Sequence, residues 1–268
     1  KTGTNYENTA NNEITVDKGI VVEDATGTET NGSQFVWIPV GTITKADGST
    51  TSINFNRYTF DESDGTPTEK NEEVIESFFQ ELSSSSYGNT VARNIANFRS
   101  SVTTNGGFYI GRYEARKSSA GTITEVGTDT VWNGITQPNA ATQARGMYDE
   151  THPFTSDLVN SYAWDTATLF LQNCGEEKYS RKTTVNTSLA SKGTNASDYT
   201  GTRDNPCNVY DMASNVYEWT TETSSGSRTP CVIRGGGYGN SDRYTSRRDT
   251  YSTSISNDNY GFRPLLYL

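Results

Sequence analysis

Apolar residues fall into short, dense runs along this chain, and long polar stretches separate them. Runs of β-branched and aromatic residues, several with apolar residues at alternate positions, are typical of half-buried strands. On this basis the sequence predicts strands over Ile14–Val22, Gln34–Val40, Ile53–Phe60 and Gly106–Arg116.

Apolar residues spaced three or four apart predict helices over Glu72–Leu82, Thr90–Ser101 and Ser161–Asn173. The last is the clearest, because Trp164 and Leu171 lie on one stripe and Gly175 signals its end. The polar stretches 117–150 and 176–203 are predicted to be loops, and no repeat of 20–50 residues is visible. We therefore expect one loop-rich α+β domain over residues 13–268, preceded by a polar tail over residues 1–12.

The composition narrows the possible partners. A net charge of −10 repels phosphate backbones, so nucleic acid is not an expected partner. Only 32% of residues are apolar, but 16 Tyr, 10 Phe and 4 Trp indicate a folded chain. The chain contains no run of 18 apolar residues, so the sequence predicts no transmembrane segment. The many Ser, Thr, Asn and Gly residues suit an extracellular, cell-surface or virion-surface protein, and a start at Lys1 suggests that a targeting segment has been removed.

Three cysteines, Cys174, Cys207 and Cys231, leave at least one thiol unpaired within the chain. Cys207 and Cys231 flank the apolar or glycine-rich blocks in the last third of the chain and are one candidate bridge. Buried free thiols are the alternative, and the sequence leaves both open.

The last sixty residues combine apolar or glycine-rich blocks with a polar segment. The blocks are Asn208–Trp219 (NVYDMASNVYEW), Val232–Asn240 (VIRGGGYGN) and Tyr260–Leu268 (YGFRPLLYL). In the 238–260 segment, every residue except Gly239 and Ile255 is Tyr, Ser, Thr, Asn, Asp or Arg. Tyrosine gives a large contact area at low entropic cost, and Ser and Asn give adaptable hydrogen bonds, as in antibody paratopes. The segment is therefore predicted to be a binding surface, and a solvated loop between two core strands is the alternative.

These blocks resemble the formylglycine-generating enzyme, or sulfatase-modifying factor, family, whose fold is a variant of the C-type lectin fold. The family's motifs GxFxIGRYEV, VSWxDAxAF, DMAGNVWEW, RGGSW and GFR are similar to Gly107–Arg116, Asn160–Phe170, Asp211–Trp219, Arg234–Tyr238 and Gly261–Arg263, and Phe35–Gly41 is similar to its opening strand. The resemblance implies a loop-rich α+β fold of the C-type lectin type, with small antiparallel sheets and two or three helices.

The chain departs from this family at the residues that carry its chemistry. The family's enzymes oxidise a substrate cysteine with a copper-binding cysteine pair just after the RGGSW block. The corresponding positions fall near Asn240 and Thr245, and no cysteine follows Cys231. Cu(I) requires soft thiolate ligands. The related iron-dependent sulfoxide synthases need a histidine cluster, whereas this chain has only His152. We therefore expect no copper and no enzyme activity.

The resemblance also implies a structural calcium ion in the DMASNVYEW turn. Its ligands would be the side chains of Asn215 and Glu218 and the carbonyl of Val216. Hard oxygen ligands at close spacing suit Ca²⁺. The alternative is that Asn215 and Glu218 only satisfy backbone groups of the turn.

Variable proteins of diversity-generating retroelements use the same fold, and their mutable segment lies between the RGG block and GFR. Adenine-directed mutagenesis of AAY codons cannot produce Lys, Glu, Gln, Trp or Met, and the 238–260 segment contains none of these. The resemblance thus implies a non-catalytic, retroelement-diversified protein that binds a protein or glycan on another cell or particle. The candidate ligand-binding residues are Tyr238, Asn240, Asp242, Tyr244, Arg247, Asp249, Tyr251, Asn257 and Asn259, whereas Arg243 or Arg248 are candidates for fixed scaffold. The alternatives are a structural pilin-like or phage tail-associated module and an oxidoreductase of the parent family.

Overall fold

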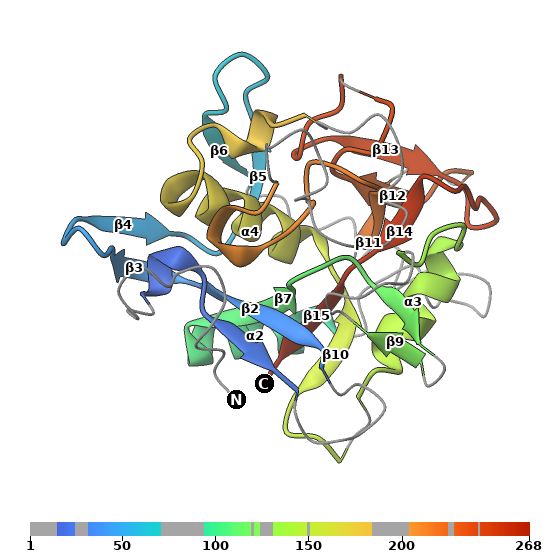
Figure 1. The fold of residues 1–268 in the computed structure, drawn as a ribbon, viewed down its shortest axis with the longest axis horizontal. Helices are drawn as coiled ribbons and strands as arrows, with labels where there is room; N and C mark the ends of the chain where they lie inside the picture. Colours follow the sequence, from blue (N-terminus) through green and yellow to red (C-terminus); the bar gives the residue numbers. More distant parts are fainter. Residues whose placement is uncertain are drawn as a thin grey trace.

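The computed structural model describes residues 15–24, 32–70, 94–118, 121–123, 131–148, 151–183, 204–224, 228–240 and 242–268. Figure 1 shows these residues as a ribbon coloured along the sequence. The strands are β1 (Val21–Glu23), β2 (Gln34–Pro39), β3 (Gly41–Thr44), β4 (Thr50–Ile53), β5 (Arg57–Phe60), β6 (Pro67–Lys70), β7 (Gly107–Gly111), β8 (Arg116–Ser118), β9 (Gly121–Ile123), β10 (Thr155–Leu158), β11 (Tyr217–Thr223), β12 (Cys231–Arg234), β13 (Arg248–Tyr251), β14 (Tyr260–Phe262) and β15 (Pro264–Tyr267). The helices are α2 (Ile95–Asn105), α3 (Gln137–Arg145) and α4 (Ser161–Cys174), with 3-10 turns η1 (Val16–Lys18), η2 (Tyr179–Arg181) and η4 (Pro206–Asn208).

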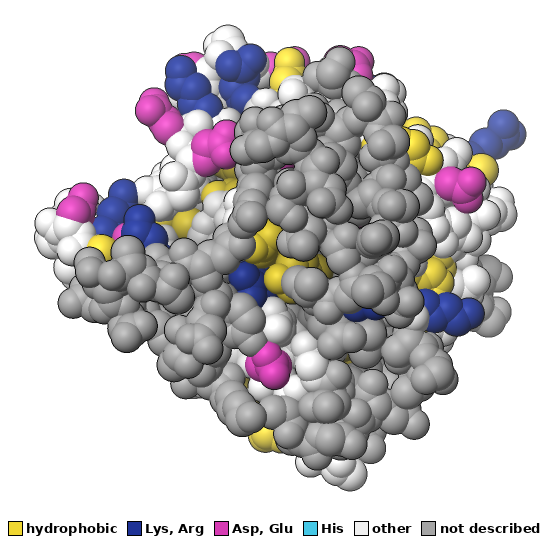
Figure 2. Space-filling view, viewed as in Figure 1, with side chains coloured by type: hydrophobic (Ala, Val, Ile, Leu, Met, Phe, Trp, Pro, Cys, Tyr) yellow, Lys and Arg dark blue, Asp and Glu magenta, His cyan; other side chains and the backbone are white. Residues whose placement is uncertain are grey.

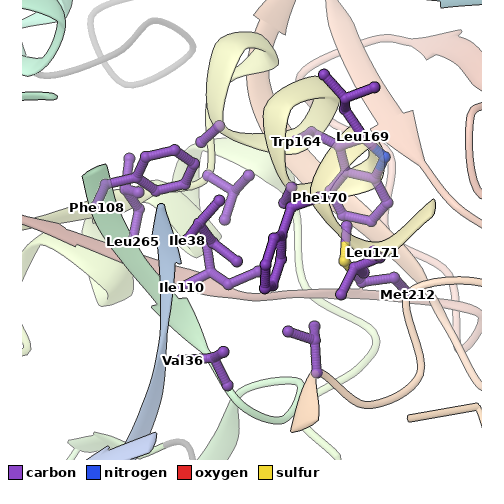
Figure 3. Close-up of a cluster of buried hydrophobic side chains, with 14 of the residues drawn as sticks. Val36, Ile38, Phe108, Ile110, Trp164, Leu169, Phe170, Leu171, Met212 and Leu265 are labelled. Atoms are coloured by element: carbon purple, nitrogen blue, oxygen red, sulfur yellow. The ribbon is translucent and has the colours of Figure 1, made fainter. Parts of the chain in front are cut away.

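An antiparallel sheet of five strands, in the order β1-β2-β7-β15-β10, lies below α4 in the view of Figure 1. Val36 and Ile38 of β2 are two residues apart and fully buried, and Ile38 pairs with Phe108 of β7, so the three side chains share one face of the sheet. Figure 3 shows these side chains facing Phe170 of α4. Burying an apolar side chain of this size contributes roughly 2 kcal/mol, so this contact is a main source of stability.

Helix α4 lies between the two larger sheets and is buried along most of its length. Asn160 caps its first turn by accepting a hydrogen bond of 2.9 Å from the N–H of Ala163. All residues from Ser161 to Leu171 are buried, and the helix packs against β2 on one side and β5 and β11 on another. This burial on all faces explains why the helix includes Asp165 and Thr166 without exposing them, a point that matters for the candidate site below.

A second sheet of four strands, in the order β13-β12-β11-β14, carries the C-terminal blocks. β12 pairs antiparallel with both β11 and β13, whereas β14 runs parallel to β11. After β14 the chain passes through Arg263 into β15 of the five-stranded sheet. The terminal YGFRPLLYL block therefore joins the two sheets.

Two hairpins, β3–β4 and β5–β6, project from this body (Figure 1). Figure 2 shows Lys and Arg interspersed with Asp and Glu over both hairpins, so the described part of this face has no patch of a single sign. The β5–β6 tip is closed by Asp61, which accepts hydrogen bonds from the N–H groups of Ser63 (2.7 Å) and Asp64 (3.2 Å).

The predicted strand 34–40 and helix 161–173 are confirmed to within one residue. The predicted strand Ile53–Phe60 is two strands, because Asn56 turns back to accept the N–H of Arg57 at 2.8 Å. Ile14–Val22 is likewise not one strand: the described part is the 3-10 turn η1, then Gly19 at φ 78, then β1. The strand expected over 106–116 is confirmed only for Gly107–Gly111.

The helix expected over Thr90–Ser101 begins later, at Ile95, where Asn94 accepts the N–H of Asn97 at 2.9 Å as N-cap. The prediction of loops throughout 117–150 is wrong, since this stretch contains α3 and the β8–β9 hairpin. Helix α3 packs through the small residues Ala140, Ala141 and Ala144, which give no visible apolar period. The helix predicted over Glu72–Leu82 and most of the loop 176–203 lie outside the described residues.

The candidate bridge between Cys207 and Cys231 is also wrong. All three thiols are free, and Cys207 and Cys231 pack in separate apolar clusters. The Cys231 thiol instead donates to Oε1 of Gln137 at 3.8 Å. The α+β fold class, with small antiparallel sheets and three helices in the described residues, is confirmed, and none of those helices is long and apolar enough to cross a bilayer.

Candidate ligand-binding surface

The 238–260 segment leaves the small sheet at the end of β12, forms the edge strand β13, and returns as β14 on the opposite edge. Three glycines let its starting point pack closely against the Asp211–Trp219 turn and the first residue of β11. A Cβ on Gly235 would lie 2.4 Å from the carbonyl oxygen of Met212, and one on Gly236 would lie 2.2 Å from that of Ala213. A Cβ on Gly237 would lie 2.6 Å from the ring of Tyr217. The glycines of the RGGG sequence are therefore a packing requirement.

The Asp211–Trp219 turn anchors the same end of the segment. Asp211 and Asn215 adopt left-handed backbone conformations (φ 63 and φ 60), which Asp and Asn tolerate better than most residues. The carbonyl of Asn215 accepts the N–H of Tyr238 at 2.7 Å. The turn thus sets where the segment begins.

Arg263 of the GFR block is fully buried and binds residues in and beside the Asp211–Trp219 turn. Its Nη2 lies 2.6 Å from Oε1 of Glu218, and its Nε donates to both carboxylate oxygens of Glu218. It also donates to the carbonyls of Gly111 (2.8 Å) and Tyr210 (2.6 Å). A bidentate guanidinium–carboxylate pair with its remaining donors satisfied is stable in a buried position.

This arrangement bears on the predicted calcium ligands Asn215, Val216 and Glu218. The side-chain amide of Asn215 donates to Glu114, and the N–H of Val216 donates to the same carboxylate at 3.1 Å. Since Arg263 occupies both oxygens of Glu218, a cation bound by Glu218 would have to compete with a guanidinium. The described residues contain no group of three or more His, Cys, Asp or Glu side chains arranged to hold a metal ion. The calcium site stays a prediction, and the geometry disfavours it.

The carboxyls around this turn nevertheless crowd together. Burial, with added repulsion from Asp211 and Glu218, raises the pKa of Glu114 well above its usual range. Burial and the charge of Asp204 raise the pKa of Asp211 to about 7. Both carboxylate oxygens of Asp204 have hydrogen-bond donors: the hydroxyl of Tyr179 at 2.6 Å and the N–H of Ala213 at 2.8 Å.

One arginine of the 238–260 segment, Arg248, belongs to a buried ionic network on the α4 side of the small sheet. Arg248 donates to Asp165 (2.6 Å), to Glu222 (2.7 Å) and to the carbonyl of Tyr58 (3.1 Å). Arg234 bridges the same two acids at 2.6 and 2.7 Å, and Arg57 contacts Glu222 at 2.6 Å. Burial alone would raise the pKa of Glu222, but the three guanidinium groups outweigh it and hold this pKa at about 2. The scaffold alternative for Arg248 is therefore the one that the geometry supports.

The other face of the small sheet is aromatic. The ring of Tyr260 lies 5.2 Å from those of Trp219 and Tyr251 and 6.0 Å from that of Tyr217 (ring centroids). Burial, with a smaller contribution from the neighbouring Tyr251 side chain, raises the pKa of Tyr260. Tyr217 and Tyr260 are 5% and 7% exposed, whereas Tyr251 is half-buried. Only Tyr251 of this group was expected at the site from the sequence.

Charged residues of the segment adjoin these tyrosines. Asp249 accepts from Arg247 at 3.0 Å and lies 3.6 Å from Arg243. Arg243 in turn lies 3.8 Å from Asp242, whose side chain is 78% exposed, and its charge acts on the pKa of Tyr217. The structure therefore brings Asp242, Arg247, Asp249 and Tyr251 together, and it adds Arg243.

The remaining candidates take different positions. Tyr244 lies under the guanidinium of Arg181 (5.7 Å to the ring centroid), and its backbone pairs with Thr183. Tyr238 and Asn240 are half-buried in the loop after β12.

Asn257 and Asn259 form the turn before β14. The Asn257 side chain accepts the N–H of Asn259 at 2.9 Å, and the Asn259 carbonyl accepts the N–H of Tyr217 at 2.8 Å. Side-chain variation at Asn259 would leave its carbonyl bond intact. Asn257 shapes the turn through its side chain, and is thus less free than the sequence suggests.

Sequence reasoning missed Arg243 and Arg181 as parts of this surface, and it missed Tyr217 and Tyr260 as the buried rings behind Tyr251. Tyr217 and Tyr260 lie in blocks that were read as fixed scaffold, and Arg181 lies at the edge of a predicted loop. One signal was present: Tyr217 stands where the DMAGNVWEW motif has Trp, next in space to a glycine that stands where RGGSW has Ser.

The positions that the resemblance assigns to the copper ligands do not fit that metal. Thr245 is fully buried; its hydroxyl donates to the carbonyl of Lys182 at 3.4 Å, and its own carbonyl accepts the indole N–H of Trp164 at 3.0 Å. Asn240 is half-buried. Neither offers the thiolate that Cu(I) prefers.

Comparison with known families agrees with these features. Residues 136–266 match the model of the sulfatase-modifying factor enzyme 1-like domain. The matched region begins just before α3 and includes α4, the Asp211–Trp219 turn, the RGGG block and GFR. The domain's resemblance to the formylglycine-generating enzyme family, inferred from the motifs, is thereby confirmed.

Three solved structures are similar to the chain at 15% identity. PvdO from Pseudomonas aeruginosa has a TM-score of 0.48, with 92% of this chain and 98% of that chain covered. CarF has a TM-score of 0.39, with 60% and 86% covered, and Treponema denticola variable protein 1 has a TM-score of 0.35, with 92% and 99% covered. Such low similarity says nothing about activity. A search among curated protein sequences gives no match.

Proposed function

We propose that this protein is a non-catalytic ligand-binding protein that presents the 238–260 segment to a protein or glycan on another cell or particle. The observation that carries the proposal is the division of labour within the segment. Arg248 and Thr245 are anchored inside the scaffold, whereas Arg247, Asp249 and Tyr251 lie side by side on a polar, aromatic face. A surface built in this way changes its side chains without changing its backbone.

The absence of suitable copper ligands supports a non-catalytic role. Asn240 and Thr245 stand where the family's enzymes carry their cysteine pair, and the Thr245 side chain is locked to the carbonyl of Lys182. Copper-dependent oxidation of a thiol substrate by the purified protein would contradict this part of the proposal.

A retroelement-diversified variable protein is the form of this function that the segment supports best. The 238–260 segment contains none of the five residue types, Lys, Glu, Gln, Trp and Met, that adenine-directed mutagenesis of AAY codons cannot produce. Its display on a cell or virion surface would suit such a role. No calcium ion is needed for the proposed binding, because the segment is held by Arg248 and by the Asn215 carbonyl.

Sequencing of the gene in populations of the source organism tests diversification. We expect substitutions at the codons of Tyr244, Arg247 and Tyr251, none at Arg248 or Thr245, and a reverse transcriptase gene beside a near-copy of the 238–263 coding region. A uniform segment with neither neighbour would refute the retroelement form of the proposal.

Binding is tested on immobilised glycan and protein arrays with the purified chain. Tyr244→Ala and Tyr251→Phe are expected to weaken a positive signal at least tenfold and to leave the melting temperature unchanged. Phenylalanine is the right replacement at 251, because the ring packs against Trp219 and Tyr260 and its loss would disturb the sheet. Tyr109→Phe, on β7, is the matched control. Unchanged binding in both segment variants, or a symmetric assembly that buries the segment, would favour the structural-module alternative.

A further inference from the structure

We propose that Cys174 and Cys207 are a disulfide-forming pair, which links the end of α4 to η4. This inference does not depend on the proposed function. Cys174 is the last residue of α4, and Cys207 is the middle residue of η4. The two elements pack against each other; Cys207 belongs to a buried apolar cluster, and Cys174 packs against the same cluster.

The contact between the two elements is close at the cysteines themselves. A Cβ placed on Gly175 would lie 3.0 Å from the sulfur of Cys207 and 2.6 Å from Cβ of Pro206. Gly175 follows Cys174 directly, so the Cα atoms of these two residues are about 3.8 Å apart. The Cys207 sulfur therefore lies against the residue next to Cys174. A disulfide needs Cα atoms about 4.4–6.8 Å apart, and the proposal is that the two cysteines reach this spacing.

The electrostatic surroundings of the two thiols agree with this placement. Burial raises the pKa of Cys174 to about 11, and the charges that act on it are Lys45, Asp17 and Lys18. Burial also raises the pKa of Cys207, and the next largest influence on it is Cys174, followed by the same three charges. Both thiols thus lie in one small region beside η1.

Cys231 offers a natural contrast. It is fully buried in the separate cluster formed by the small sheet and α3, and its thiol donates to Gln137. A disulfide between Cys231 and either other cysteine would require a large rearrangement. The structure therefore selects one pairing of the three that the sequence allows.

The oxidation is an ordinary thiol–disulfide exchange with a low-molecular-weight disulfide such as oxidised glutathione. The Cys174 thiol, the more exposed of the two, loses a proton and attacks one sulfur, releasing one glutathione thiolate. The Cys207 thiolate then attacks the Cys174 sulfur of the mixed disulfide and releases the second glutathione. Two protein thiols lose two electrons and two protons, and one glutathione disulfide becomes two thiols. The raised thiol pKa values make the reaction slow near neutral pH and faster at higher pH.

The link would close a loop that contains η2 and would fix the entry to the Asp211–Trp219 turn. At present η4 is held by the Cys207 thiol, which donates to the carbonyl of Asp17 at 3.2 Å, and by close packing on Gly19, where a Cβ would lie 1.8 Å from the Cys207 carbonyl oxygen. Cys207 also has a left-handed backbone (φ 48), which the surrounding contacts must maintain.

The experiment incubates the folded full chain with oxidised glutathione at pH 8.5, blocks the remaining thiols, and maps tryptic peptides without reduction. Lys178, Arg203 and Arg228 place the three cysteines in three different tryptic peptides. We expect a cross-linked product of the Cys174 and Cys207 peptides, with the Cys231 peptide alkylated. A link through Cys231, stable mixed disulfides, or two thiols still free after prolonged oxidation would overturn the proposal.

Thermal unfolding supplies a second readout. We expect the oxidised chain to melt about 5–10 °C above the reduced chain, because the link restricts the unfolded state. Cys231→Ser should keep this difference, whereas Cys174→Ser and Cys207→Ser should abolish it. An equal difference in all three variants would show that oxidation acts elsewhere.

Discussion

Adjacent arginines in β13 and the loop before it have opposite roles, and their replacement by alanine separates scaffold from surface. Arg248 donates to Asp165, Glu222 and the carbonyl of Tyr58, with its side chain 25% exposed. Arg247 contacts Asp249 only among the described charged residues, and both side chains of that pair are substantially exposed (35% and 24%). The two variants remove the same atoms one residue apart.

The magnitude for Arg248→Ala follows from which groups keep partners. After the change Asp165 retains Arg234 and the N–H of Tyr58, and Glu222 retains Arg57 and Arg234. No acid is left buried alone, so the full penalty of about 3–5 kcal/mol for a broken buried pair does not apply. Loss of three hydrogen bonds, two of them between charged groups, is expected to lower the free energy of unfolding by about 2–4 kcal/mol. For Arg247→Ala the exposed pair predicts about 1 kcal/mol or less.

Urea unfolding followed by tryptophan fluorescence measures both values, and thermal unfolding checks them. We expect the melting temperature to fall by about 5–15 °C for Arg248→Ala and by less than about 4 °C for Arg247→Ala. Arg248→Lys, which keeps the charge but cannot bridge both acids in the same way, should fall between wild type and Arg248→Ala. Equal losses for the two alanine variants, or a larger loss for Arg247→Ala, would refute the assignment of Arg248 to the scaffold.

Two further outcomes follow from the buried acids of the scaffold. The pKa of Glu222 is lower in the folded state, at about 2, than its usual value of 4.5, so its stabilising contribution is present above pH 4.5 and is lost as the pH falls from 4.5 through 2. Glu222→Gln should therefore remove about 3 kcal/mol near neutral pH and flatten the acid limb of stability against pH; the same acid limb in both proteins would contradict this. Since Arg263 already occupies Glu218, we expect Ca²⁺ or a chelator to shift the melting temperature by less than about 2 °C, and a rise of several degrees with Ca²⁺ would instead support the ligand set Asn215, Val216 and Glu218.

Local sequence patterns predicted those elements whose own apolar residues mark the face that is buried. The β2 strand and α4 were visible because their apolar residues follow one period and their ends carry Asn160 or Gly175 as signals. Helix α3 was missed because alanines give no strong period, and its burial depends on β10 and β11, which are distant in sequence. The 53–60 strand was overextended because alternation continues through a turn that only a side-chain hydrogen bond at Asn56 reveals.

The candidate surface shows the same division. Sequence composition located the 238–260 segment, and the fixed blocks around it placed it between two strands of one domain. It could not tell Arg247 from Arg248, because Arg248 begins β13 whereas Arg247 lies in the loop before it, and the partners that bury Arg248 are far away in the chain. Nor could it add the buried rings of Tyr217 and Tyr260 behind Tyr251, which come together only because β14 pairs in parallel with β11.

The sequence by itself determined that the chain folds, that its C-terminal blocks are scaffold, and that a polar, tyrosine-rich segment lies among them, because these properties depend on residue type and order. The tertiary structure alone decided which side chains of that segment are anchors, which acid each arginine neutralises, and which cysteines are neighbours. Those properties depend on distances between residues such as Cys174 and Cys207, or Asp165 and Arg248, that only the packed fold brings together.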